Sequence, residues 1–338
     1  MTGIDTHAPP LAGNRAGPPR RILVVGAGGR HRTEAAIARG AGALGHTARM
    51  LDARRWTRLG RLAPALLIRM TDRFAPDVVI LTRYAARLDD ATLARLVRGR
   101  EATTWYFDFA EQAHAGVVRL ARASGSLYLT CPSIRTTYAR AGAPDVRFLP
   151  QALDPEEDRP ASTVPARYRC DVSFVGSGQY RDRHALLGAV AGVADLQIRG
   201  LGWDAQEHHL PVRGGRVRGR RLAQVVAGAA ISLGAAATRA QAEAPLCISN
   251  RIWKVLGSGG FYLGPWTPGM ELLVREGEHC ALFRSEEDAV AQVRYWLGRP
   301  EERAAIARAG RAHALAHHTY AHRLELLLRG ESFPYTTV

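Results

Sequence analysis

Residues 21–26, Arg-Ile-Leu-Val-Val-Gly, and residues 170–176, Cys-Asp-Val-Ser-Phe-Val-Gly, decide the fold class of this chain. Each is a short, mainly apolar run that contains β-branched residues and ends in glycine. This composition is typical of a buried strand of a parallel sheet that runs into a tight turn. Helical and strand patterns alternate behind each run, and such alternation predicts βαβ units. The sequence therefore predicts an α/β protein with two parallel sheets.

The alternation forms two series of elements. In the first series we expect strands at 21–26, 46–52, 76–82, 103–107, 127–130 and 146–149, and helices at 33–44, 64–74, 88–98, 116–123 and 133–141. In the second we expect strands at 170–176, 196–200, 230–234, 260–264 and 280–283, and helices at 184–193, 221–229, 250–256, 270–275, 286–297, 300–316 and 320–328. Thr33 is of a type that caps helices and Pro64 of a type that begins them, so both mark predicted helix starts.

A proline-rich, acidic stretch, residues 150–165, separates the two series and is typical of an interdomain linker. We divide the chain into a disordered tail (1–20), a first Rossmann-like domain (21–150), a linker (151–167), a second Rossmann-like domain (168–318) and a C-terminal helix with its tail (319–338). The sequence leaves open whether this last helix crosses back onto the first domain. Doubly wound sheets bind ligands at the carboxyl ends of their strands, so two tandem Rossmann-like domains predict a central cleft that both domains face.

The chain is strongly basic, with a net charge of +15, and Lys254 is the single lysine beside 45 arginines. These charges are spread over the whole sequence, and no recognition helix, zinc finger or RNA-binding motif accompanies them. The sequence therefore argues against a nucleic-acid partner and favours small anionic ligands. The preference for arginine, with abundant alanine and glycine, is typical of a bacterial genome of high GC content.

The remaining composition indicates neither a membrane segment nor a metal site. No run of 18 apolar residues could span a bilayer, and the N-terminal stretch lacks the apolar region of a signal peptide. The four cysteines lie far apart and show no metal-ligand spacing. We therefore expect a cytoplasmic protein without a transmembrane segment or a bound metal. The sequence does not indicate its oligomeric state.

The first glycine loop, Gly26-Ala27-Gly28-Gly29-Arg30-His31, follows the first strand. A dinucleotide-binding fingerprint requires a third glycine where His31 stands, although Asp52 ends the second strand where a ribose-binding acid would lie. We favour a simple tight turn and keep a nicotinamide-dependent oxidoreductase as the alternative. In either case Arg30 and His31 are expected to point into the cleft and to contact an acceptor substrate.

The second glycine loop, residues 176–183, follows a strand and precedes a helix. Backbone N–H groups and the helix dipole favour an anion at such a place, so we assign Gly176 and Ser177 to ligand binding. Arg181 and Arg183 suit phosphate oxygens. A polar turn with a solvated pair of arginines is the equally weighted alternative.

A third stretch, residues 249–264, carries Ser249, Asn250, Arg251 and Lys254 on a short helix before a glycine-led strand. The spacing allows Asn250, Arg251 and Lys254 to share one helical face. An amide and two cations at a helix start predict a site for a diphosphate and a ribose. The alternative is a solvated polar face on an ordinary helix.

These segments resemble CgeB-like glycosyltransferases, also called the glycosyl-transferases group 1 type 2 family. The resemblance runs in order through residues 76–77, 105–108, 149–150, 171–177, 199–203, 250–264, 269–271 and 286–323. It implies the fold of two facing Rossmann-like domains known as GT-B, and a nucleotide-diphosphate sugar as co-substrate. It also implies that no cofactor and no metal take part, because side chains and helix dipoles neutralise the leaving diphosphate.

The chain departs from the family pattern at one position. Members of the family often have a glutamate after the aromatic residue of this helix, where it binds the donor ribose, whereas here Lys254 follows Trp253. This substitution keeps a second alternative open, a non-catalytic nucleotide-binding protein. It puts the ribose contact and the identity of the donor nucleotide in question.

Glycosyl transfer needs a general base for the acceptor hydroxyl. Asp108 directly follows the strand at 103–107, so its carboxylate is expected at the carboxyl edge of the first sheet. We assign it as the base, with His31 and Glu111 as weaker candidates and a simple turn or capping aspartate as the alternative.

Further side chains at strand ends complete the predicted site. We assign Arg83, Tyr84 and Tyr106 to the acceptor. We assign Trp203 to the donor, where it would stack on a nucleobase, with core packing as the equally weighted alternative. The predicted function is transfer of a sugar from a nucleotide-diphosphate sugar to an acceptor hydroxyl, without a metal.

Overall fold

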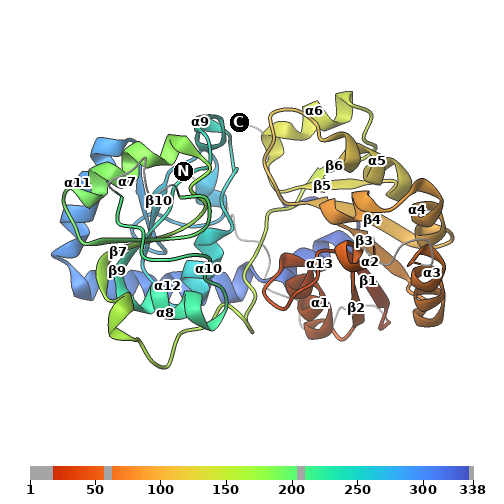
Figure 1. Ribbon diagram of the computed structural model, residues 1–338, viewed down its shortest axis with the longest axis horizontal. Coiled ribbons are helices and arrows are strands. Elements are labelled where there is room, and N and C mark those ends of the chain that lie inside the picture. Colours follow the sequence, from red (N-terminus) through yellow and green to blue (C-terminus); the bar gives the residue numbers. More distant parts are fainter. Residues whose placement is uncertain (1–17, 57–62, 204–209, 335–338) are drawn as a thin grey trace, which may run out of the picture. The chain divides into compact units, whose positions relative to one another are not determined.

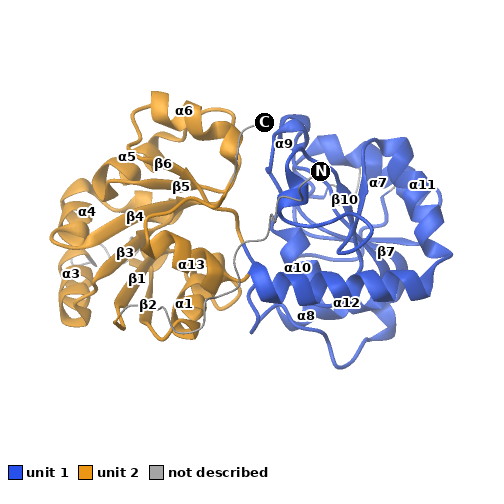
Figure 2. Cartoon of the chain, turned by 180° about the vertical axis from the view of Figure 1, so that it is seen from behind, with its two compact units in different colours: residues 1–10, 152–318 blue, residues 11–151, 319–338 orange. Residues whose placement is uncertain are grey.

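The computed structural model describes residues 18–56, 63–203 and 210–334, so most of the predicted N-terminal tail lies outside the described residues. Figure 1 shows its helices and strands, and Figure 2 colours the two compact units into which the chain divides. Within the described residues, unit 1 comprises residues 152–318, and unit 2 comprises residues 18–151 together with residues 319–334.

Unit 2 is built on a six-stranded parallel sheet in the order β2-β1-β3-β4-β5-β6. Its strands are β1 (Arg21–Gly26), β2 (Thr47–Asp52), β3 (Val78–Leu81), β4 (Glu101–Tyr106), β5 (Leu127–Leu129) and β6 (Val146–Phe148). Its helices are α1 (Thr33–Ala43), α2 (Ala53–Trp56), α3 (Ala63–Phe74), α4 (Asp90–Val97), α5 (Ala115–Ser124), α6 (Arg135–Arg140) and α13 (Tyr320–Leu328). Residues 22–25 of β1 are buried, as the apolar run predicts for a central strand covered on both faces.

Unit 1 is built on a five-stranded parallel sheet in the order β11-β10-β9-β7-β8. Its strands are β7 (Cys170–Val175), β8 (Leu196–Arg199), β9 (Ala229–Leu233), β10 (Tyr262–Pro265) and β11 (Ala281–Phe283). Its helices are α7 (His184–Ala191), α8 (Arg220–Gly228), α9 (Arg239–Glu243), α10 (Arg251–Gly257), α11 (Glu286–Leu297) and α12 (Pro300–His317). Phe174, Ile198, Ile231 and Leu263 lie at the centre of its apolar core.

The predicted parallel α/β architecture is confirmed, with corrections at individual elements. Arg32, and not Thr33, is the N-cap of α1, and it makes no side-chain capping bond. The helix predicted at 270–275 is a short 3-10 turn, Met270–Leu272. The sequence analysis missed the 3-10 helix Arg83–Arg87 and α9, because elements of about one turn are too short to show a hydrophobic period.

The last helix, α13, packs on α1 and so belongs to unit 2. Gly40 of α1 makes this possible, because a Cβ atom there would lie 2.8 Å from the carbonyl carbon of Tyr320 and 2.9 Å from the nitrogen of Ala321. Arg323 of α13 is fully buried and donates from Nε to the backbone oxygen of Pro150 (3.1 Å). Among the described residues, no helix has both the length and the apolar character needed to cross a bilayer.

Two glycines of α1 provide a matched test of this packing. We expect Gly40→Ala to lower the free energy of unfolding by about 1–3 kcal/mol, because the added methyl group must push α13 away. Gly42 lies in the same helix with nothing within 4 Å of the added Cβ, so Gly42→Ala should raise stability by up to about 1 kcal/mol. Urea unfolding of both variants measures the difference. Equal effects of the two substitutions would contradict the close contact.

Candidate active site

The carboxyl ends of β7 and β9 form the centre of the candidate site in unit 1. The two strands are neighbours in the sheet, and the chain leaves them toward opposite edges, toward β8 from β7 and toward β10 from β9. Ligands of doubly wound sheets bind at such a topological switch point. The side chains that enter this point come from the start of α7 and the start of α10.

Arg183 enters from a 3-10 turn, Arg181–Arg183, that directly precedes α7. Its side chain is 5% exposed, and its guanidinium donates to the backbone oxygen of Ala236 from Nε (3.2 Å) and Nη2 (3.1 Å). It also donates from Nη1 to the backbone oxygen of Ser177 (3.0 Å). Arg183 therefore joins the loop after β7 to the loop after β9. Arg181, on the same turn, is exposed.

Arg251, the first residue of α10, enters the switch point from the other side. Its guanidinium donates from Nε to the backbone oxygen of Val175 (2.9 Å) and from Nη1 to that of Ala235 (3.1 Å). A Cβ atom at Gly176 would lie 2.8 Å from Nη2 of Arg251. Glycine at this position therefore lets the guanidinium reach the end of β7.

The two guanidiniums are held by backbone oxygens and aromatic contacts. They lie over the ring of Phe174, 5.5 Å (Arg183) and 4.6 Å (Arg251) from its centroid. Within the described residues, no carboxylate forms an ion pair with either. Burial, and then the charge of Arg251, lower the pKa of Arg183 to about 10, and burial also lowers the pKa of Arg251. Because desolvated cations are costly without a partner, this site favours an anionic ligand.

In the glycine loop after β7, two backbone amides are already bound within the protein. The N–H of Gly176 donates to Arg199 (2.9 Å), and the N–H of Gly178 donates to Leu201 (2.9 Å), in both cases to the backbone oxygen. The Ser177 hydroxyl also donates to the oxygen of Leu201 (3.2 Å). These groups extend the pairing of β7 with β8 and are not available to a phosphate, so the charge of the site comes from arginine side chains.

Trp203 has the packing role that the sequence analysis left as an alternative. Its indole N–H donates to the backbone oxygen of Gly176 (3.0 Å). Its ring stacks on His184 at 5.1 Å between centroids and meets the ring of Phe174 edge-on at 6.1 Å. These contacts hold the glycine loop against the core of unit 1. Stacking of this ring on a nucleobase is therefore not supported.

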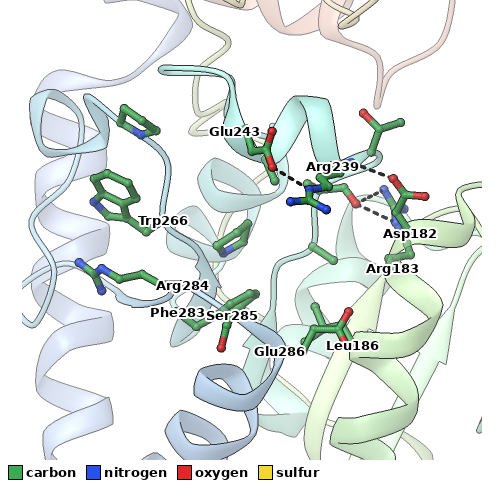
Figure 3. A pocket seen from close by; sticks show the side chains of 16 residues that line it. Asp182, Arg183, Leu186, Arg239, Glu243, Trp266, Phe283, Arg284, Ser285 and Glu286 are labelled. Atoms are coloured by element: carbon green, nitrogen blue, oxygen red, sulfur yellow. Dashed lines mark hydrogen bonds and ion pairs between the residues drawn. The ribbon is translucent and has the colours of Figure 1, made fainter. Parts of the chain in front are cut away.

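A cavity of about 820 Å³ opens beside Arg183 (Figure 3). Its walls come from the carboxyl ends of β9, β10 and β11 and from the first residues of α7, α9 and α11. The volume is in the range of sites that bind cofactors and substrates. Trp266 and Arg284 lie across the cavity from Asp182 and Arg183 in Figure 3.

Trp266 and Arg284 were missed by the sequence analysis. Trp266 is 39% exposed, an unusual value for the largest apolar side chain, and the Arg284 guanidinium lies 5.4 Å from its ring centroid. Arg284 forms an ion pair with Glu276 (3.0 Å). The signal that could have revealed Trp266 is its position directly after the glycine-containing strand β10, between Pro265 and a second proline.

The start of α11 forms the acidic part of the cavity wall. Ser285 caps this helix by accepting from the N–H of Asp288, and Glu286, Glu287 and Asp288 occupy its first turn. These acids neutralise the positive end of the helix dipole, so a phosphate is disfavoured there. Charges of both signs therefore line the cavity, with Asp182 beside Arg183 on one side and Arg284 on the other.

Ser249 and Asn250 lie at the start of α10 as predicted. The Ser249 hydroxyl accepts from the N–H of Arg251 (3.3 Å). Asn250 is the N-cap residue, and its Oδ1 atom is buried without a hydrogen-bond partner among the described residues. An unsatisfied buried acceptor is costly, so this amide favours a ligand hydroxyl or a water molecule as partner.

Lys254 does not share a site with Arg251, contrary to the prediction from spacing. Its Nζ atom forms an ion pair with Oδ1 of Asp158 (3.2 Å), whose side chain is 4% exposed. Oδ2 of Asp158 accepts from the backbone N–H of Asp154 (3.1 Å). Burial raises the pKa of Asp158, and Lys254 opposes that rise. The ion pair of Lys254 therefore holds residues 154–158, which belong to the predicted linker, against α10.

The carboxyl edge of unit 2 carries the predicted base. Oδ2 of Asp108 accepts from Nη1 of Arg83 at 2.5 Å, and both side chains are about half exposed (50% and 41%). Arg83 also donates from Nη2 to the hydroxyl of Tyr84 (3.1 Å). Asp108, Arg83 and Tyr84 thus lie together as predicted. Arg30 and His31 are exposed in the loop after β1.

Tyr106 differs from the prediction, because it lies in the core of unit 2. It is 3% exposed, and its ring packs against that of Tyr138 at 5.8 Å between centroids. Burial, and then the neighbouring Tyr138 and Asp108, raise the pKa of its hydroxyl. Its role is to support the strand end that presents Asp108, and the structure does not expose it to an acceptor.

The alternative of a nicotinamide site finds no support in the first glycine loop. A Cβ atom at Gly28 would lie 2.3 Å from Oδ2 of Asp52, so the aspartate lies against the loop. Arg54 donates from Nε to Oδ1 of Asp52 (3.2 Å) and from Nη2 to the oxygen of Gly28 (2.7 Å). The acid that would bind a ribose is therefore already bound by the protein.

Replacement of Lys254 tests its role at Asp158. We expect Lys254→Met to lower the free energy of unfolding by about 1–2 kcal/mol at pH 7, since a buried carboxylate loses its charged partner. The pKa of Asp158 then rises further, so the folded chain binds this proton more tightly than the unfolded chain does. Stability is therefore lost as the pH rises above the ordinary aspartate pKa, and the deficit should shrink at pH 4.5. Urea unfolding at both pH values measures it, with Lys254→Arg as the charge-conserving control. A loss that does not depend on pH would contradict this role.

Comparisons with known proteins agree with this architecture. Residues 181–329 match the sequence profile of the family described as glycosyl transferase-like. Anabaena HepE in complex with UDP-glucose superposes with a TM-score of 0.63 at 13% identity, over 92% of this chain and 98% of that chain. A sucrose-phosphate synthase from Thermosynechococcus elongatus gives a TM-score of 0.62 at 12% identity, over 92% and 98%. A glycosyltransferase from Rickettsia africae gives 0.61 at 10% identity, over 92% and 97%.

Among curated protein sequences, none matches this chain. Within the residues that the structure describes, no three histidine, cysteine or acidic side chains are grouped so that they could hold a metal ion. Together with the two doubly wound sheets, the structural matches show that the chain has the GT-B fold. Within this fold, residues 181–329 are similar to the glycosyl transferase-like family.

Proposed function

We propose that the chain transfers a sugar from a nucleoside-diphosphate sugar to an acceptor hydroxyl. In this proposal unit 1 binds the donor, and unit 2 supplies the general base and the acceptor contacts. The observation that carries the proposal is the pair of guanidiniums, Arg183 and Arg251, that lies at a topological switch point without a carboxylate partner among the described residues. HepE, which shares the fold, was crystallised with UDP and with UDP-glucose.

The chemistry of the leaving group agrees with such a pair. As the bond from the anomeric carbon to the phosphate oxygen breaks, negative charge develops on the diphosphate and must be stabilised. Arg251 donates to the protein from Nε and Nη1, and its Nη2 has no partner among the described residues, so this atom remains for a phosphate oxygen. We therefore propose that arginine side chains, without a metal ion, stabilise the leaving group.

The cavity beside Arg183 suits the nucleoside. The exposed ring of Trp266 offers a stacking surface for a base, and the acidic start of α11 offers acceptors for ribose hydroxyls. In this assignment the ribose does not depend on the position of Lys254, where the family has its glutamate.

We propose Asp108 as the general base. The acceptor oxygen forms a bond to the anomeric carbon, the bond from that carbon to the diphosphate breaks, and the hydroxyl proton passes to Oδ1 of Asp108. Arg83 holds the carboxylate through Oδ2, while Oδ1 has no partner among the described residues. A base that is oriented by a second group is the usual arrangement in general-base catalysis.

Donor binding is tested with two arginine variants and a control from the same cavity wall. We expect Arg183→Gln and Arg251→Gln each to weaken UDP binding about 10- to 100-fold, the range of a charge-assisted hydrogen bond. Arg239 lines the cavity but is 86% exposed and paired with Glu243, so Arg239→Gln should stay within about threefold of the unmodified protein. Isothermal titration with UDP in the presence of EDTA measures the affinities.

Thermal midpoints measured without ligand verify that these variants fold. If Arg183→Gln does not fold, Arg183→Lys replaces it as a variant that retains the positive charge. Unchanged UDP affinity in both variants would contradict the assignment of Arg183 and Arg251 to donor binding. Stabilisation of the protein by NAD and not by any nucleoside diphosphate would favour the oxidoreductase instead.

The base is tested with two aspartates that form similar ion pairs. We expect Asp108→Asn to reduce the release of UDP from a UDP-sugar about 100-fold or more, while UDP affinity stays within about threefold. Asp90 accepts from Arg119 at the same distance, 2.5 Å, elsewhere in unit 2, so Asp90→Asn should retain full turnover. Full activity of the Asp108 variant would refute its role. Nucleotide binding without turnover in the unmodified protein would favour a non-catalytic binding protein.

A further inference from the structure

Unit 2 has its own topological switch point, and a ring of arginines surrounds one tyrosine there. β1 and β3 are neighbours, and the chain leaves them toward opposite edges of the sheet. Tyr84 follows β3 on the 3-10 helix Arg83–Arg87. Its ring centroid lies 5.4 Å from the guanidinium carbon of Arg54, 5.0 Å from that of Arg83 and 5.7 Å from that of Arg87.

Two of these arginines are held in place by carboxylates. Arg54 is paired with Asp52 (3.2 Å), and Arg83 is paired with Asp108 (2.5 Å). Asp52 neutralises the guanidinium of Arg54, and Asp108 neutralises that of Arg83. Each ion pair also fixes the orientation of its arginine side chain. These two ion pairs therefore set the position of Tyr84 between Arg54 and Arg83.

Two further arginines have no carboxylate partner among the described residues. Arg87 is exposed at the end of the 3-10 helix, and Arg32 is the N-cap residue of α1. Glu34, the acid in the first turn of α1, is buried. Its Oε1 atom accepts from the N–H of Ala27 and from the hydroxyl of Thr82, both at 2.9 Å. Within the described part of the chain, Arg32 and Arg87 thus keep positive charge that no ion pair neutralises.

The positive charge of the surrounding arginines affects the pKa of the Tyr84 hydroxyl. Partial burial raises its pKa, but the hydrogen bond from Arg83 and the charges of Arg83, Arg32 and Arg54 more than offset that effect, so the net pKa lies below the ordinary value. The hydroxyl oxygen accepts from Arg83, and its own hydrogen remains free to be donated. Tyr84 therefore offers a neutral donor in the middle of a cationic ring.

We propose that an arginine ring binds a phosphate group carried by the acceptor. We define this ring as the three guanidiniums over Tyr84, those of Arg54, Arg83 and Arg87, together with Arg32 at the N-cap of α1. The proposal rests on the proposed function, because it takes unit 2 as the acceptor unit. A phosphate monoester brings close to two negative charges and three strong acceptor oxygens, which match two unneutralised guanidiniums and a tyrosine hydroxyl. A neutral sugar would leave this charge unmatched.

The test uses the full-length chain with saturating UDP, so that a phosphate cannot occupy the site in unit 1. Titration calorimetry compares glucose 6-phosphate with glucose. We expect glucose 6-phosphate to bind at least tenfold more tightly, and more weakly as NaCl is raised, because exposed charges are screened. Arg32→Gln and Arg87→Gln should each reduce the affinity for glucose 6-phosphate about tenfold. Arg73, an exposed arginine on α3 of the same unit, provides the control, and Arg73→Gln should change nothing.

A second arm distinguishes a lipid phosphate from a sugar phosphate. Phosphatidylcholine vesicles with and without phosphatidate are sedimented with the protein. Binding that needs phosphatidate and is lost in Arg87→Gln would assign the phosphate to a lipid acceptor, and binding of glucose 6-phosphate alone would assign it to a sugar phosphate. The proposal is overturned if neither binds, or if the two ring variants bind as the unmodified protein does. UDP affinity is measured separately, so a chain that binds UDP and no phosphate keeps the proposed function and loses only this inference.

Discussion

Backbone oxygens at the ends of strands must find donors, and in unit 1 this need is met by arginine. Four backbone oxygens at the end of β7 and in the loops after β7 and β9 accept from two arginine side chains. Arg183 binds the oxygens of Ser177 and Ala236, and Arg251 binds those of Val175 and Ala235. Removal of either side chain would leave buried acceptors without partners, so the shape of both loops depends on these two guanidiniums.

The same bonds create the chemistry of the site. A carbonyl group satisfies an N–H but does not neutralise a charge, so each guanidinium keeps its positive charge in a poorly hydrated place. An acidic partner would have removed the affinity for an anion, and a solvated arginine would have lost it to screening. The bonds that support the two loops therefore also keep positive charge at the switch point. Glycine at position 176 leaves room for one of these guanidiniums, because a Cβ there would lie 2.8 Å from Nη2 of Arg251.

The switch point of unit 2 follows the same topology with different electrostatics. There Arg54 and Arg83 have carboxylate partners, and the residues are more exposed than Arg183. Positive charge in unit 2 thus lies on the surface, where salt screens it, whereas in unit 1 it lies in a desolvated crevice. The two sheets of one chain therefore differ in how deeply their positive charge is buried.

The sequence by itself determined the two parallel sheets. A continuous apolar run such as residues 22–25 is stable as a strand only when both of its faces are covered, as they are in a parallel α/β sheet. It also placed Asp108 and the loop of Arg183 after strands, and Arg251 at the start of a helix, because the carboxyl edge of a parallel sheet follows from strand order along the chain. Tertiary structure alone decided which partner each side chain meets. Spacing grouped Lys254 with Arg251, but the ion pair with Asp158 comes from a segment 96 positions away. Local periodicity contains no information about such a distant contact. The contact forms only because the folded chain packs the segment of Asp158 against α10.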